Sequence, residues 1–174
     1  MTIQLDCLAE MPLHPLPKED VATTAERAFV DLTARLEDLC LAETDLDCAP
    51  FADIAFDDWF RDAEAARTAA ITAARFVRYA PAIKPTDVYL ATLGKAFETM
   101  MLTTDPKVYR RLHDCFVADA SPRPPTAITG YGLGAAKSLQ MFRFQIARLL
   151  SFEDYLPEAI SLERAVPDEI APSL

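Results

Sequence analysis

Glycine is scarce in this chain, with four among 174 residues, and three of them, Gly130, Gly132 and Gly134, fall in one short run. The chain also lacks the dense alternation of β-branched residues that is typical of strands, so the composition does not favour a sheet. A proline-rich stretch at 119–125 precedes the glycines, and an amphipathic stretch follows them. The run therefore predicts a rigid loop, a flexible turn and then the start of a helix.

The glycine run lacks the context of a nucleotide-binding motif. A phosphate-binding P-loop requires glycine at the positions of Tyr131 and Ala136, ahead of Lys137, so that pattern fails. The dinucleotide fingerprint fits residues 130–135 by spacing, but it works only between a strand and a helix of a βαβ unit, which the surrounding sequence does not provide. Three interpretations stay open: a hinge, a helix-packing contact, or a weak anion site at the helix N-terminus beside Lys137.

Long hydrophobic runs are missing as well. No apolar stretch approaches the roughly 20 residues that cross a bilayer, so we expect no membrane span. The first six residues carry no basic charge and lead into no long apolar segment, so a secretory signal is not expected either.

Cysteine pairs with metal-ligand spacing are also lacking. Cys7, Cys40, Cys48 and Cys115 are irregularly spaced and include no C-x-x-C, which predicts free thiols in a cytoplasmic protein and no zinc site. The acidic connector predicted at 43–53 lacks the glycine and the final glutamate of a calcium loop. We therefore expect no metal and no cofactor.

Basic residues are outnumbered by acidic ones, 17 to 27, and the net charge is −10. The imbalance is uneven, because residues 1–62 hold 15 acidic and 4 basic residues whereas residues 63–150 hold 6 acidic and 12 basic. A negative excess disfavours direct nucleic-acid binding, since attraction to phosphates drives most of that affinity. It favours a protein partner with a basic surface, which the acidic first third of the chain would contact.

Apolar residues at three- and four-residue steps predict five helices, at about 18–42, 54–79, 86–102, 106–118 and 133–150. Prolines fall between several of these segments, where they end or begin helices. We therefore predict an all-α fold, a mostly antiparallel bundle of about five helices that forms one domain at 18–150. A proline-rich arm at 1–17 precedes it. An acidic tail at 151–174 follows and packs partly on the bundle, with one short helix near 158–164.

The fifth predicted helix carries two lines of side chains. One line is plainly apolar, and the second joins Lys137, Met141, Phe144 and Arg148 at steps of four, three and four residues. A helix that is apolar on two sides is typical of the middle of a bundle, so we expect Met141 and Phe144 to be buried. If they are exposed instead, this line forms a partner site or a pocket wall.

Histidine is almost absent, and only His113 lies among charged residues on a predicted helix. Its neighbours Arg110, Arg111 and Asp114 put it on the charged face, while the apolar positions, Val108 among them, are expected to face the core. No second histidine or glutamate lies three or four residues away, as a helical metal site would require. We therefore expect His113 to be a surface or structural histidine rather than a ligand.

No group of residues has the pattern of a catalytic site, which argues against an enzyme. We predict a non-catalytic protein-interaction module: an adaptor, an accessory or regulatory subunit, or a dedicated chaperone. Its expected contacts are the two extended termini and an acidic docking face on the first helix, formed by Asp31, Glu37 and Asp38.

The alternative is a helical bundle that binds or acts on an acidic small molecule, because cationic groups beside an apolar cavity suit such a ligand. The residues of this hypothetical pocket are Arg110, Arg111, His113, Lys137, Met141, Phe144 and Arg148. The sequence leaves open the identity of the partner or ligand and the oligomeric state.

Overall fold

A computed structural model describes residues 21–48, 55–117 and 133–157. Within these ranges the chain forms five α-helices and one 3₁₀ turn: α1 Thr24–Asp47, α2 Phe56–Tyr79, α3 Pro85–Leu102, α4 Pro106–Val117, α5 Leu133–Leu149 and η1 Glu153–Tyr155. The prediction of an all-α bundle of about five helices is confirmed. The N-terminal arm, Gly130 and Gly132, and the helix predicted near 158–164 lie outside the described residues.

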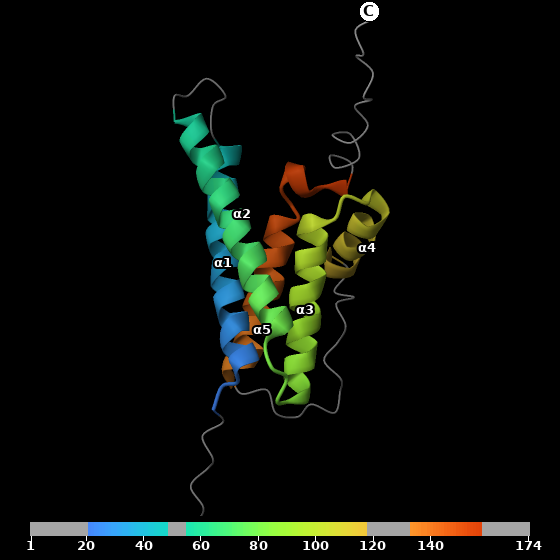
Figure 1. The fold of residues 1–174 in the computed structure, drawn as a ribbon. Helices are drawn as coiled ribbons and strands as arrows, with labels where there is room; N and C mark the ends of the chain where they lie inside the picture. The colour runs from blue at the N-terminus through green and yellow to red at the C-terminus, as the bar shows by residue number, and fades with distance from the viewer. Residues whose placement is uncertain (1–20, 49–54, 118–132, 158–174) are drawn as a thin grey trace, which may run out of the picture.

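Helices that follow one another in the chain run antiparallel (Figure 1). α1 packs against both α2 and α5, and α3 packs against α1, α2 and α4. α5 runs in the same direction as α1, so these two neighbours are parallel (Figure 1). As a result, the end of α1, the start of α2 and the turn η1 come together at one end of the bundle. None of the described helices is both long enough and apolar enough to cross a membrane.

The core combines large rings with small residues that allow close helix packing. Phe29 of α1 and Phe142 of α5 are almost fully buried, and their ring centroids lie 5.1 Å apart. α2 contributes Ala70 and Ala74, which leave room for neighbouring helices. α3 packs closely on α2 at Gly94, where an added Cβ would lie 2.8 Å from the Ala74 carbonyl oxygen. Gly94 is thus needed for this close contact between backbones.

The first helix begins and ends later than the sequence pattern predicts. Thr23 caps α1: its Oγ1 accepts a hydrogen bond from the Glu26 N–H at 3.1 Å, and its own N–H donates to Glu26 Oε2 at 2.7 Å. Residues 21–23 are therefore outside the helix. At the other end, residues 43–47 continue the helix although their acidic character suggested a connector. Glu43 is buried there and pairs with Arg67 of α2 at 2.8 Å, so this part of α1 packs on its neighbour rather than forming a connector.

The expectation that Met141 and Phe144 are buried is wrong. Phe144 is 62% exposed and Met141 is 36% exposed. α5 packs on its neighbours through the other line of side chains, Leu139, Phe142 and Ile146, which are buried. Met141 and Phe144 on the second line are left exposed, whereas Arg148, at the end of the same line, is half-buried against α1.

The face of α4 that packs on the bundle is only partly the predicted one: Leu112 and Phe116 pack against the core, but Val108 does not. Tyr109 and His113 are buried, whereas Val108 is 37% exposed. The two buried residues are four positions apart and so share one face of the helix, which is the face that packs on the bundle. Two polar aromatic side chains thus join a contact that the sequence pattern assigned to apolar residues alone.

Candidate functional site

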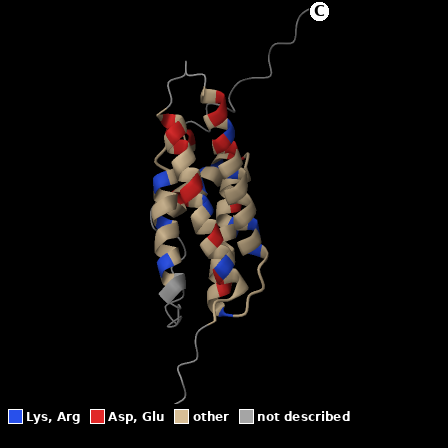
Figure 2. Cartoon of the chain, turned by 90° about the vertical axis from the view of Figure 1, so that its left-hand side faces the viewer, with Lys and Arg blue, Asp and Glu red and all other residues tan. Residues whose placement is uncertain are grey.

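Acidic residues gather at the end of the bundle where α1 ends and α2 begins (Figure 2). The carboxylates here are Glu43, Asp45, Asp47, Asp57, Asp58, Asp62, Glu64, Glu153 and Asp154. All are exposed except Glu43. The antiparallel pairing of α1 with α2 therefore converts an acidic stretch of sequence into an acidic end of the molecule.

Helix stability explains only part of this acidity. Asp57 and Asp58 lie in the first turn of α2, where negative charge complements the helix dipole. α1, in contrast, has no basic residue in its last turn and holds Asp45 and Asp47 there. Negative charge at a helix C-terminus is unfavourable by about 0.3–1 kcal/mol per residue. The acids that end α1 are thus present in spite of local stability.

A pocket of about 510 Å³ opens at this end of the bundle. Phe56 and Phe60 form one wall from successive turns of α2, and Phe152 comes from the segment between α5 and η1. Leu46 adds an aliphatic contribution from α1. Phe60 is 51% exposed, so its ring is accessible to a binding partner.

Carboxylates complete the pocket. Asp47, Glu153 and Asp154 are exposed and line it together with the buried Glu43. No basic side chain appears among the described residues of this lining. The pocket therefore combines an aromatic interior with a negative rim, which suits a cationic group carried on an apolar stem.

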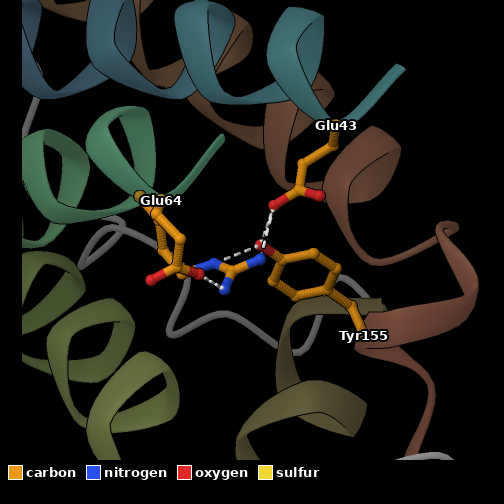
Figure 3. Close-up of polar contacts among 4 residues, drawn as sticks. Glu43, Glu64 and Tyr155 are labelled. Carbon is orange, nitrogen blue, oxygen red and sulfur yellow. Dashed lines mark hydrogen bonds and ion pairs between the residues drawn. The ribbon is translucent and has the colours of Figure 1, made fainter. Parts of the chain in front are cut away.

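A hydrogen-bond network around the buried side chains of Glu43 and Tyr155 lies at this end of the bundle (Figure 3). Glu43 is 3% exposed, and its Oε1 accepts hydrogen bonds from the Tyr155 hydroxyl at 2.6 Å and from Arg67 at 2.8 Å. Arg67 Nε donates to the Tyr155 oxygen at 3.0 Å, and Arg67 also pairs with Glu64. Tyr109 of α4 donates to the Tyr155 carbonyl at 2.7 Å. These bonds fasten η1 to α1, α2 and α4.

Tyr155 and Arg67, two of the groups in this network, keep their protons near neutral pH. Burial raises the pKa of Tyr155 far above its ordinary range, so the hydroxyl stays protonated. Burial lowers the pKa of Arg67, but the neighbouring Tyr155 and Glu43 outweigh it and the net shift is upward, so the guanidinium stays charged. The network is a structural lock that holds the Phe152–Asp154 wall of the pocket in place.

The residues of the alternative, cationic pocket are not brought together. Arg110 and Arg111 line a separate pocket of about 410 Å³ on α4, with Pro106, Lys107 and Asp114. His113 faces the bundle instead and is buried. Its Nε2 has no hydrogen-bond partner among the described residues, and its Nδ1 lies 3.5 Å from Asp114 Oδ1.

The α5 residues of that alternative also lie elsewhere. Lys137, Met141 and Phe144 are exposed along one line of the helix. Arg148 is half-buried and donates a hydrogen bond to Thr44 Oγ1 at 2.8 Å, so it ties α5 to α1. None of these residues appears in the described lining of the α4 pocket.

The predicted docking face on α1 is exposed but partly neutralised. Asp31 and Asp38 both pair with Arg35, at 3.7 Å and 3.4 Å, and Glu37 lies on the same exposed side. Exposed pairs of this kind contribute little to stability, but they reduce the negative charge that a partner would meet.

Only part of the aromatic pocket can be recognised in the sequence. Phe56 and Phe60 are visible as an aromatic helix start, and Asp47 as part of an acidic segment. Phe152 is distant in the chain. It comes close to them only because α5 runs parallel to α1 and ends at the same end of the bundle. No sequence pattern links Glu43 to Tyr155.

Comparisons with family models, curated proteins and solved structures found no match to this chain. Among the described residues, no group of three histidine, cysteine, aspartate or glutamate side chains is arranged to hold a metal ion.

Proposed function

We propose that this chain is a non-catalytic protein-interaction module that binds a basic protein partner through the acidic end of its bundle. The role would be that of an adaptor, an accessory or regulatory subunit, or a dedicated chaperone. The observation that carries the proposal is the aromatic pocket with its rim of exposed carboxylates, Asp47, Glu153 and Asp154. Complementary charge would steer such a partner to this end and fix its orientation.

The uncompensated acids support a binding role for this end. Asp45 and Asp47 oppose the dipole of α1, so their presence has no benefit for the helix that carries them. Arg61 and Arg67, the arginines in the first half of α2, are each bonded to carboxylates, Arg61 to Asp58 at 3.0 Å. The rest of the negative charge is available to a partner.

The acidic end supports docking better than the side of α1. Asp31 and Asp38 are already paired with Arg35, and the pocket of about 500 Å³ that Asp31 lines also contains the basic Arg27, whereas the described lining of the acidic-end pocket includes no basic side chain. The free thiols of Cys40 and Cys48 fit the cytoplasmic location that the proposal assumes.

The first experiment is native mass spectrometry of the chain purified from its own source at low salt, in three forms. One is the wild type. The second neutralises the acidic end by Asp45→Asn, Asp47→Asn and Asp62→Asn. The third, a control with the same change in charge, neutralises the side of α1 by Asp31→Asn, Glu37→Gln and Asp38→Asn.

A basic protein should co-purify with the wild type and with the α1-side control but not with the acidic-end variant. With that partner purified, the acidic-end substitutions should raise its Kd by about tenfold at low salt and by less at high salt, because exposed charges are screened. A partner that binds all three forms equally would contradict the proposal. Loss in the control alone would move the docking site to the side of α1.

A further inference from the structure

We propose that the aromatic pocket at the acidic end is the anchor site for an arginine side chain of the partner. The inference rests on the proposed function and specifies how the partner is recognised. The guanidinium would lie against the ring of Phe60, with its N–H groups directed to the carboxylates of the rim.

The size of the pocket fits an anchoring side chain with part of its peptide. At about 510 Å³ it lies within the range of sites that enclose small ligands. The interior offers Leu46 and three phenylalanine rings to an aliphatic stem and to an adjacent apolar residue. A segment that places arginine next to such a residue would fill both parts.

Its aromatic surface favours arginine over lysine. Phe60 presents an accessible ring, and Phe152 comes from the segment that precedes η1. A guanidinium is planar and weakly hydrated, so it stacks on a ring with less desolvation than an ammonium group. Lysine would be attracted by the same charge but would lose more of its hydration.

Charge at the rim completes the recognition. Asp47, Glu153 and Asp154 line the pocket and form no ion pair with a described residue. Carboxylates can receive a guanidinium through two parallel hydrogen bonds, which gives direction as well as attraction. The same rim repels acidic ligands. A neutral side chain would cover the carboxylates without forming the charged hydrogen bonds that replace their lost hydration.

Tyr155 is a positioning residue for this site. Its hydroxyl bonds Glu43 and Arg67, while its carbonyl receives the Tyr109 hydroxyl, so the wall at 152–154 is held from two directions. Because the wall is fixed before binding, less conformational freedom would be lost when a partner docks.

The experiment is a titration of the full-length, ¹⁵N-labelled protein with two synthetic peptides, acetyl-Gly-Leu-Arg-Leu-Gly-amide and the same peptide with citrulline in place of arginine. Citrulline keeps the shape and removes the charge. Two protein variants are matched: Phe60→Ala at the pocket, and Phe76→Ala, which removes an exposed phenylalanine 68% accessible near the opposite end of α2. Circular dichroism checks that both variants keep the fold.

The arginine peptide should shift the amide signals around Phe60 and Phe152, and the citrulline peptide should bind about tenfold more weakly. Phe60→Ala should weaken the arginine peptide by about threefold to tenfold, and Phe76→Ala should leave it unchanged. Equal binding of the two peptides, an unaffected Phe60→Ala variant, or shifts confined to another part of the molecule would each overturn the inference.

The two proposals fail in different ways. If the co-purified partner is lost from the acidic-end variant yet binds Phe60→Ala with an unchanged Kd, the arginine anchor is wrong and the docking end stands. If no partner depends on the acidic end, the proposed function is wrong, whatever the peptides do.

Discussion

Glu43 and Tyr155 are 112 positions apart in the sequence, yet the tyrosine hydroxyl donates a 2.6 Å hydrogen bond to the Glu43 carboxylate inside the bundle. Arg67 contacts both groups, at 2.8 Å and 3.0 Å. Three elements thus meet in one network: α1, α2 and the turn that follows α5. This turn and the residue before it supply Phe152, Glu153 and Asp154 to the pocket lining, so the stability of this end and part of its binding geometry depend on one set of contacts.

Removing the Tyr155 hydroxyl should lower both the stability of the protein and the affinity of the pocket for the arginine peptide. Tyr155→Phe deletes one donor and one acceptor from the buried network and leaves Glu43 bonded to Arg67. We expect the free energy of unfolding, measured by urea denaturation, to fall by about 1–3 kcal/mol. The Kd for the arginine peptide should rise, because the pocket wall is less firmly held.

Tyr79→Phe is the matched control, since Tyr79 is 69% exposed. It should leave both quantities unchanged. If Tyr155→Phe is as stable as the wild type, or if it loses stability while the peptide binds normally, the link between the Tyr155 hydrogen bonds and the pocket is contradicted.

Acid should destabilise the fold partly through Asp87. Its side chain is buried and receives hydrogen bonds from Thr23 Oγ1 at 2.7 Å and from the N–H groups of Ile83 and Lys84 at 2.8 Å and 2.9 Å. Burial by itself raises the pKa of this carboxyl, but the hydrogen bonds from Lys84, Thr23 and Ile83 outweigh it and hold the pKa below the ordinary value of 3.8.

The folded protein therefore binds this proton less readily than the unfolded chain. The stability that Asp87 contributes is present above pH 3.8 and is lost as the pH falls through the lower, folded value. Asp87→Asn should lower the free energy of unfolding near neutral pH by about 1–3 kcal/mol and flatten the acid side of the stability profile. Asp31→Asn, at an exposed site, should change neither. A variant with an unchanged acid slope would show that Asp87 does not govern it.

Local patterns predicted the helices well but not their environment. The three- and four-residue steps located α1, because helix formation is set by neighbours in sequence, but the Thr23–Glu26 cap that sets its start was missed and the predicted start at 18 was too early. Phe144 was misassigned because the same apolar spacing fits either a central or a peripheral helix. The position of α5 depends on which helices it packs against, and that is a property of the whole chain.

The candidate site shows the same division. Phe56 and Phe60 share a face by helical spacing alone. Their meeting with Phe152 needs the direction of α5, and the burial of Glu43 needs its contact with Arg67. The sequence predicted that negative charge is concentrated in the first third of the chain. In the structure this charge gathers at one end of the bundle, because α1 and α2 are antiparallel.

His113 offers a test of the alternative hypothesis that α4 helps to bind or act on a small molecule. Its Nε2 is buried and has no hydrogen-bond partner in the part of the chain that the structure describes, which is unfavourable. His113→Leu replaces the ring with an apolar group of similar size, so the free energy of unfolding should stay within about 1 kcal/mol of the wild type or increase. Partner binding should be unaffected. Loss of function from a stably folded His113→Leu protein would instead support a chemical role for the imidazole.

Gly94 tests how closely α2 and α3 are packed. Alanine normally favours a helix over glycine by about 1 kcal/mol, so Gly94→Ala would be stabilising if space allowed it. A Cβ at this position would lie 2.8 Å from the Ala74 carbonyl oxygen and 3.0 Å from Val77 Cβ. The closest atom belongs to the backbone of α2, which cannot move aside without displacing the helix. We expect the free energy of unfolding of Gly94→Ala, measured by urea denaturation, to fall by about 1–3 kcal/mol. Thr92→Ala, at an exposed position of α3, supplies the comparison and should stay within about 0.5 kcal/mol of the wild type. A Gly94→Ala protein more stable than the wild type would mean that α2 and α3 lie farther apart in solution than this contact requires.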